Sequence, residues 1–348
     1  MATSVSTATL SQSLRYQLTR MQAELVKANS EVASGRVADV GLSLGARTTQ
    51  SISLNRDMAR LDGIVDQNSL ASTRLTTTQD ALSQLIGRAQ SLRSTLSAGL
   101  SGNAASSISM ADAKTTLSTM TSMLNTTVNG EYIFAGINTD VRPLGDYTAT
   151  GSPAKAAFDA GFQGFFGFSQ NDPAAANITS AQMESFLDTV VVPQFMGTDW
   201  QANWSDATDQ TITSRISLNE TASTSVSANA DGIRKLAMVA TTIFDLFSSS
   251  TMSDAAKSTL MTRGVTMVSD AIDDITALQS RTGIVQKQVT DASARLKTQM
   301  NVLDGAIGKL EGVDPYEAST RVNSLLDQIE TSYALTARLQ KLSLTKFL

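Results

Sequence analysis

Hydrophobic residues at the two ends of the chain follow the same spacing. Near the N-terminus they recur at steps of four and three residues: Leu14, Leu18, Met21, Leu25, Ala28 and Val32. A matching series follows Asp314-Pro315 near the C-terminus: Ala318, Val322, Leu325, Ile329, Tyr333, Thr336 and Leu339. This spacing places the apolar side chains along one stripe of a helix, as in helices that pack along another helix. We therefore predict that the two ends pair in one coiled coil.

Longer patterns of the same kind lie between the two ends. One runs over residues 54–96 and another over residues 261–310, and shorter ones cover 110–124 and 233–247. Patterns of the first two lengths exceed an ordinary globular helix and indicate a coiled coil or an elongated bundle. The chain is therefore expected to run out along a helical rod and to return along it.

The middle of the chain has a different character. Most of its aromatic residues and prolines lie between Tyr132 and Trp204. This enrichment is typical of a small β-rich domain inserted in a helical chain. Between Gly130 and Gly136, the run Tyr-Ile-Phe predicts a strand bounded by turns, most simply a β-hairpin packed on the bundle. We interpret the phenylalanines of 162–168 as core strands of the insert, in preference to an aromatic platform for a glycan.

Together the patterns predict a mainly α fold. We expect an elongated helical bundle or coiled coil formed by the N- and C-terminal arms, with an inserted small β-rich domain. Residues 1–45 with 315–348 would form a terminal coiled-coil domain, and 46–135 with 222–314 a helical rod domain with a β-hairpin. Residues 136–221 would form the inserted β-rich outer domain.

The composition argues against most kinds of chemistry. The chain has 348 residues, of which 41% are hydrophobic, but no Cys and no His. A thiol nucleophile, a thiolate metal site and the commonest general base are therefore missing together. We expect no catalytic residues, no metal site and no cofactor, and we interpret the chain as a structural protein and not an enzyme.

The charge and the distribution of apolar residues limit the partners. A net charge of −5 without a basic patch argues against nucleic acid. No apolar run approaches the roughly 20 residues that a spanning helix needs, so we expect no membrane insertion. The first residues lack the basic start and apolar centre of a cleaved signal peptide. The sequence therefore predicts a cytoplasmic protein, or one exported by a machine that does not use such signals.

Two short segments resemble the bacterial flagellin family. After the first predicted helix, Val32-Ala-Ser-Gly-Arg-Val37 is similar to the Leu-Ser-Ser-Gly-x-Arg-Ile type segment of flagellins. Asn129-Gly-Glu-Tyr-Ile-Phe-Ala-Gly136 resembles the Gly-x-Tyr-Ile-Phe-Ala-Gly segment of the hook-associated protein 3 branch, the hook–filament junction proteins. The residues that carry the resemblance are Ser34, Gly35, Arg36, Gly130, Tyr132, Ile133, Phe134, Ala135 and Gly136. The Asp-Asp-Ala-Ala-Gly run of filament flagellins is replaced by residues 38–45, which weakens the case for a filament subunit.

The resemblance implies an axial structural protein of the flagellum. Such a protein is exported unfolded through the flagellar type III apparatus, without a cleaved signal peptide, and assembles outside the cell as a ring at the hook–filament junction. Its implied partners are other copies of itself, hook-associated protein 1 on the hook side, flagellin on the filament side and an export chaperone before assembly. The expected assembly interface is the pair of terminal seams: Leu14, Leu18, Met21, Leu25, Val32, Val322, Leu325, Ile329, Tyr333 and Leu339.

Two other functions remain open at this point. One is a filament flagellin, which would share the helical arms but occupy another position. The other, from a different class, is a glycan-binding or glycan-processing module carried on a helical stalk, with its site in the aromatic insert. No spacing of acidic residues singles out a catalytic pair there. Both alternatives stay secondary to the junction protein.

Overall fold

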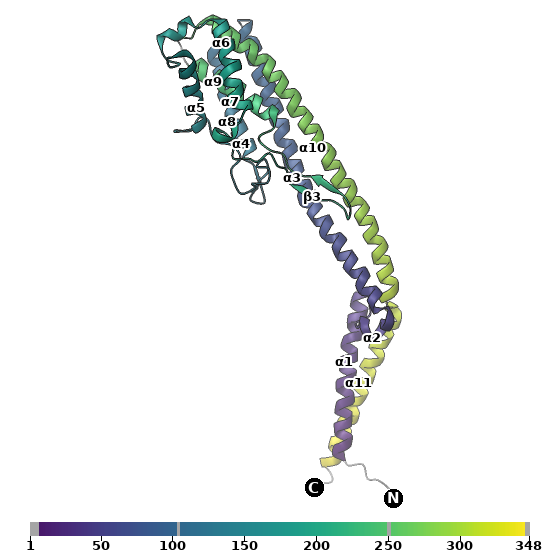
Figure 1. The fold of residues 1–348 in the computed structure, drawn as a ribbon. Helices are drawn as coiled ribbons and strands as arrows, with labels where there is room; N and C mark the ends of the chain where they lie inside the picture. The colour runs from purple at the N-terminus through teal and green to yellow at the C-terminus, as the bar shows by residue number, and fades with distance from the viewer. Residues whose placement is uncertain (1–6, 103–104, 249–251, 345–348) are drawn as a thin grey trace. The chain divides into compact units, whose positions relative to one another are not determined.

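The computed structural model describes residues 7–102, 105–248 and 252–344 (Figure 1). The chain divides into two compact units, which we call unit 1 (residues 1–63 with 295–348) and unit 2 (residues 64–294). Two long helices, α3 (Thr48–Leu100) and α10 (Asp254–Glu311), contribute to both units. Long helices with two small sheets confirm the predicted fold class. The division into three domains stays a prediction.

Unit 1 is built on the two terminal helices, α1 (Thr7–Ser34) and α11 (Pro315–Leu344), which pack side by side (Figure 1). Between α1 and α3 lie the short helix α2 (Val40–Leu44) and the 3₁₀ turn η1 (Gly45–Arg47). The start of α11 follows from its sequence. Pro315 suits the first turn, and the Asp314 carboxylate accepts a hydrogen bond from the Tyr316 backbone N–H at 2.8 Å.

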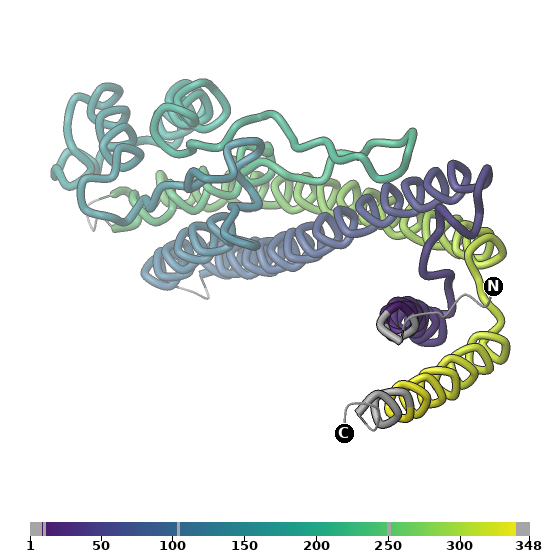
Figure 2. The backbone as a smooth tube through the Cα atoms, turned by 90° about the horizontal axis from the view of Figure 1, so that it is seen from below, coloured from purple at the N-terminus to yellow at the C-terminus, as the bar shows by residue number. Residues whose placement is uncertain are grey.

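Unit 2 has a helical core. The α3 and α10 segments run side by side (Figure 2), and α4 (Ser106–Leu124) packs against α9 (Asp231–Ser248). The leucines of α3 that carry the predicted pattern, Leu82, Leu85, Leu92 and Leu96, are completely buried. No helix in the described part of the chain is long and apolar enough to cross a membrane.

The segment 136–221 contains more helix than its composition predicted. Its helical elements are α5 (Pro153–Phe166), the 3₁₀ turn η2 (Pro173–Asn177), α6 (Ser180–Phe186), the π-helical turn η3 (Leu187–Val191), α7 (Val192–Met196) and α8 (Asp199–Asn203). The interpretation of 162–168 as core strands is therefore wrong, because most of this run lies in α5. Phe162 is nevertheless buried in the core, as that interpretation required.

Helix caps explain this difference. The Ser152 side chain caps the first turn of α5, Pro153 occupies its first position, and Gly167 ends it with a φ of 79°. Thr179 and Gln182 form a reciprocal capping box at the start of α6. The aromatic side chains suggested strands, but these local signals favour helices.

Two short hairpins form the β part of the fold. Strands β1 (Thr127–Val128) and β2 (Glu131–Tyr132) pair antiparallel through a turn in which Asn129 and Gly130 have φ values of 54° and 85°. Two left-handed residues in succession are what a tight two-residue hairpin turn needs. A hairpin was predicted at this segment, but of the predicted strand Tyr-Ile-Phe only Tyr132 lies in a strand, because Ile133 and Phe134 follow the hairpin in a turn. Strands β3 (Thr213–Arg215) and β4 (Thr221–Ser223) form the second hairpin.

Candidate assembly surface

The terminal helices meet along the predicted seam. Leu325 and Ile329 of α11 are buried, as is Ala28 of α1. The other seam residues of this kind, Leu14, Leu18, Met21, Leu25 and Val322, are half-buried. Partial burial follows from the geometry, because two helices packed alone can cover only one stripe of each other. The pair buries its seam only partly within one copy.

Two predicted interface residues are exposed and not part of the buried seam. Val32 is 40% exposed and Tyr333 is 51% exposed. The inward position near the end of α1 is taken by Glu31, because its carboxylate accepts a hydrogen bond from Arg321 of α11 at 3.1 Å. The Tyr333 hydroxyl accepts a hydrogen bond from the Gln22 side-chain amide of α1 at 3.0 Å. The side chain of Leu339 lies outside the described residues.

Other large apolar side chains are exposed at the edge of the seam and on the remaining sides of α1 and α11. We call this set the outer face of the terminal pair: Tyr16 and Val26 of α1, and Tyr316, Leu326, Tyr333 and Leu335 of α11. Tyr316 is the most exposed of them, at 84%. Single exposed apolar residues are ordinary, but several on one helix pair indicate a surface that another protein covers.

The first family segment, residues 32–37, lies at the end of α1 and contacts the chain between α10 and α11. Gly35 ends α1 with a φ of 67°, and its N–H donates to the Glu31 carbonyl at 2.9 Å. Its own carbonyl accepts the Val313 N–H at 3.1 Å, and Val37 N–H donates to the Glu311 carbonyl at 2.7 Å. Residues 35–37 thus form a short antiparallel bridge with residues 311–313, where α10 ends and α11 begins.

Three carboxylates and two guanidinium groups surround this bridge. Arg36 forms ion pairs with Asp304 at 3.0 Å and with Glu311 at 3.4 Å. Glu311 also accepts hydrogen bonds from the Ser51 hydroxyl and, at 2.9 Å, from the Asn55 amide. We call this set, with the Glu31–Arg321 pair, the elbow network: Glu31, Arg36, Ser51, Asn55, Glu311 and Arg321.

The elbow network is a structural element and not a reaction site. The Glu311 side chain is only 6% exposed, and such a carboxylate is costly to bury unless cations and donors surround it. All six side chains are used in holding the chain where α1 and α11 join the rest of unit 1. Arg36 could be identified from its family segment, but Glu31 and Glu311 could not, because they look like solvated residues in a helical pattern.

The second family segment lies in unit 2 and is mainly buried. Ile133, Phe134 and Ala135 are almost completely inaccessible. The Phe134 carbonyl accepts the Ala228 N–H at 2.8 Å, and a side chain at Gly136, whose φ is 69°, would collide with the Thr208 carbonyl. The apolar residues of this segment therefore anchor the hairpin to its own unit and do not form an exposed surface.

Shifted ionisation in unit 2 also has a structural cause. Burial raises the pKa of Asp245, although Lys155, whose ammonium lies 2.9 Å away, acts in the opposite direction. Burial, followed by the negative charge of Asp245, raises the pKa of Tyr147 far above its ordinary value. A hydrogen bond to Asp274 raises the pKa of Lys235. Asp245, Lys155 and Tyr147 join α9 to the start of α5 and to the loop before it.

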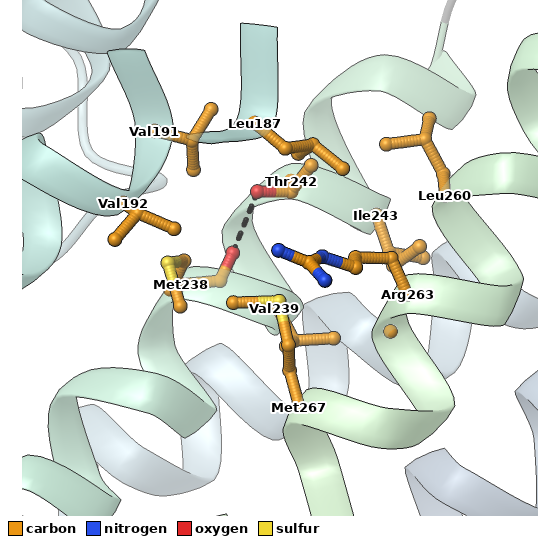
Figure 3. A pocket seen from close by; sticks show the side chains of 11 residues that line it. Leu187, Val191, Val192, Met238, Val239, Thr242, Ile243, Leu260, Arg263 and Met267 are labelled. Atoms are coloured by element: carbon orange, nitrogen blue, oxygen red, sulfur yellow. Dashed lines mark hydrogen bonds between the residues drawn. The ribbon is translucent and has the colours of Figure 1, made fainter. Parts of the chain in front are cut away.

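The cavity in Figure 3 offers no reaction site either. It lies between η3, α7, α9 and α10 and is lined mainly by aliphatic and methionine side chains, with a volume of about 20 Å³. The one hydroxyl there, Thr242, donates to the Met238 carbonyl at 2.7 Å. Such a volume accommodates about one water molecule. Among the described residues, no group of acidic side chains could hold a metal ion.

Comparison with known proteins gives a consistent result. The family model for the bacterial flagellin N-terminal helical region matches residues 5–139, and that for the C-terminal helical region matches residues 265–348. A solved structure described as a flagellar hook-associated protein from Vibrio parahaemolyticus has a similar fold, with a TM-score of 0.51 and 9% identity. The similarity covers 76% of this chain and 97% of that one. No curated protein sequence matches the chain.

Proposed function

Because the chain belongs to the bacterial flagellin family, we propose that it is a structural protein of the flagellar axis that assembles as a ring at the hook–filament junction. One observation carries this proposal: the terminal helices bury a single seam and leave the outer face exposed. A surface of this kind becomes buried when copies pack side by side. The predicted seam residues pair α1 with α11 within one copy, and those that stay half-buried there, Leu14, Leu18, Met21, Leu25 and Val322, would be covered together with the outer face when copies pack.

Two features favour the junction over the filament. The segment 129–136 is similar to that of hook–filament junction proteins, and residues 38–45 depart from the filament flagellin pattern. The similarity in fold to a hook-associated protein supports the same position. The ring would contact hook-associated protein 1 on one side and flagellin on the other.

The proposed role needs no catalysis and no cofactor. Of the aromatic run 162–168, Phe162 is buried and packs edge to face on Phe186, Phe166 and Phe168 are half-buried, and Phe165 is 38% exposed. The run is therefore partly used in the core of unit 2. The carboxylate of Asp245 is likewise held by Lys155 and is not directed at an open cleft.

Export precedes assembly in this proposal. The chain would leave the cell unfolded, without a cleaved signal peptide, and would be accompanied to the export apparatus by a chaperone. We propose that the chaperone covers α11 from Val322 to Leu339, because an apolar stripe without its partner helix favours aggregation. Removing the chain beyond Asp314 would then abolish chaperone binding, measured by titration of purified proteins. Unchanged binding would contradict this assignment.

Gold labelling of intact flagella tests the proposed position. A short epitope inserted at Ala149, in an exposed loop, leaves both helical arms unchanged. We expect gold particles in a single band where the hook meets the filament, with cells that carry the untagged gene as the control. Labelling along the whole filament would indicate a filament subunit, and unlabelled flagella would contradict a flagellar role.

A further inference from the structure

A lysine and an aspartate of unit 2 meet in a position that suits a covalent bond between them. Lys155, in the first turn of α5, and Asp245, on α9, are 90 residues apart in the sequence. The Lys155 ammonium lies 2.9 Å from Asp245 Oδ1, and the Asp245 side chain is only 3% exposed. An ionised carboxylate is costly to keep in such a place. An amide between the two side chains would remove both charges.

A second carboxylate contacts the same ammonium. Asp159 lies one turn further along α5, and its Oδ1 is also 2.9 Å from Lys155 Nζ. The Asp159 side chain is 48% exposed, and the same oxygen accepts a hydrogen bond from the Gln170 amide at 3.2 Å. One carboxylate is therefore buried beside the nitrogen, and the other is in contact with water. The buried one is placed to react with the nitrogen, and the exposed one to accept a proton from it.

The buried side of this cluster is aromatic. The Tyr147 ring packs on Trp204 and Phe244, and its centroid lies 6.0 Å from Lys155 Nζ. Among the residues that the structure describes, neither the Tyr147 hydroxyl nor Asp245 Oδ2 makes a hydrogen bond of normal geometry. Burial raises the pKa of Asp245, which favours the neutral acid that an amine can attack. The Tyr147 hydroxyl, whose pKa burial also raises, stays protonated and can donate to the oxygen that remains on the carbonyl.

We propose that Lys155 and Asp245 join in an isopeptide bond once the chain has folded. Burial lowers the pKa of Lys155, but hydrogen bonds to Asp245 and Asp159 raise it overall, so the nitrogen begins as an ammonium. One ammonium proton passes to Asp245, which gives a neutral amine and a carboxylic acid. The Nζ–Cγ bond then forms, and the bond from Cγ to the protonated oxygen breaks. A second proton from the nitrogen passes through Asp159 to the departing oxygen, which leaves as water.

The reaction would occur once in each chain, without a cofactor and without oxidation or reduction. The Lys155 side chain is 42% exposed, so the water that is released has a way out. The chain has no Cys, so no disulfide can hold α5 to α9. An amide between residues 155 and 245 would do so, because a cross-link that closes a long loop restricts the unfolded chain. The bond depends on the fold of unit 2 and not on assembly, so the inference is independent of the proposed function.

Mass spectrometry of the purified full-length chain tests the bond. We expect an intact mass that is lower than the sequence requires by one water molecule, and a branched tryptic peptide that contains Lys155 and Asp245. The Lys155→Arg variant keeps the positive charge and should have its full mass. Lys287 and Asp291 are an internal control, because their charged atoms lie 3.0 Å apart but both side chains are well exposed. Trypsin should cleave after Lys287 and release unlinked peptides.

The variant Asp159→Asn separates the reaction from the ion pair. It leaves Lys155 beside Asp245 but removes the group that accepts the proton, so the bond should form about 10²–10⁴-fold more slowly, with an unchanged circular dichroism spectrum. A full mass and linear peptides from the folded, unaltered chain would overturn the inference, as would a loss of water that persists in Lys155→Arg. Linking of Asp159→Asn at the rate of the unaltered chain would overturn the role of Asp159.

Discussion

Gly35 shows how one backbone conformation holds the end of α1. Its φ of 67° lies in the left-handed region, which other residues enter at a cost of about 1–2 kcal/mol. Space is not the constraint, because a Cβ at this position would meet no atom within 4 Å. Glycine is needed here only for its backbone conformation. The direction in which a substitution changes the stability of unit 1 can therefore be predicted.

We expect Gly35→Ala to destabilise unit 1 by about 1–2 kcal/mol. Gly63 is a matched control: it lies inside α3, also in unit 1 and also in open space, so Gly63→Ala should stabilise by about 0.5–1 kcal/mol. Urea unfolding followed by circular dichroism measures both. Equal effects of the two changes would contradict the role of the left-handed conformation.

Glu311 is the residue on which the elbow network depends. Glu311→Ala removes the acceptor for Ser51, Asn55 and Arg36, and a buried donor left without an acceptor costs about 1–3 kcal/mol. We expect this decrease in the free energy of unfolding to appear in the transition followed by circular dichroism. Both tryptophans, Trp200 and Trp204, lie in unit 2, so the transition seen by their fluorescence should stay in place.

The control for this prediction is Asp304→Asn. Asp304 binds the same arginine, Arg36, but its side chain is 59% exposed, so its removal should change stability by less than about 1 kcal/mol. If Asp304→Asn destabilises as much as Glu311→Ala, the burial of the Glu311 carboxylate is not the cause.

Neighbouring leucines of α11 separate the seam from the outer face. Leu325 is 7% exposed and Leu326 is 46% exposed. In the assembled protein, Leu325→Ala should therefore weaken the pairing of α11 with α1 by about 2–4 kcal/mol, while Leu326→Ala should change that pairing by less than about 0.5 kcal/mol. In cells the prediction for Leu326→Ala is different: the stable variant should incorporate poorly into flagella. Normal incorporation of the Leu326→Ala variant would show that Leu326 is not part of the assembly surface.

Features of the fold that depend on neighbouring residues in the sequence could be predicted, and features that depend on contacts between distant residues could not. The terminal seam could be predicted because Leu325, Ile329 and Ala28 repeat at helical spacing. The elbow network could not, since Glu31 and Glu311 become partners only when distant helices meet. In the insert the aromatic residues led to a prediction of strands. Two helix-capping signals are also present in the sequence and predict helices: Ser152-Pro153 at the start of α5, and Thr179 with Gln182 at the start of α6.

The candidate surface was predicted to the same extent. The residues that face the partner helix follow from spacing alone, but the outer face does not, because Tyr16 and Tyr316 fall outside the seam pattern. Arg36 was identified because it lies in a family segment. The segment does not predict that Arg36 forms ion pairs with Asp304 and Glu311. Sequence patterns therefore predicted the helices that meet, and the structure added the groups that hold them.

At the scale of the whole molecule, we expect the terminal pair to depend on assembly. Its seam is partly buried in one copy and its outer face is exposed, whereas unit 2 has a large closed core. Ordering a residue costs about 1–2 kcal/mol, which one half-buried seam offsets only in part. We expect residues 14–32 of the free monomer to exchange their amide hydrogens rapidly, and residues 81–96 of α3 slowly. Strong protection of 14–32 in the monomer would contradict this account.

Deletion of the gene in its source bacterium would show whether the protein joins the hook to the filament. Electron microscopy of the cells would be combined with a protein assay of the medium, and with a strain in which the gene is restored. We expect cells with hooks but no filaments, flagellin lost into the medium, and recovery when the gene is restored. Filaments that persist in reduced number or length would indicate a filament subunit, and unaffected flagella would contradict the account.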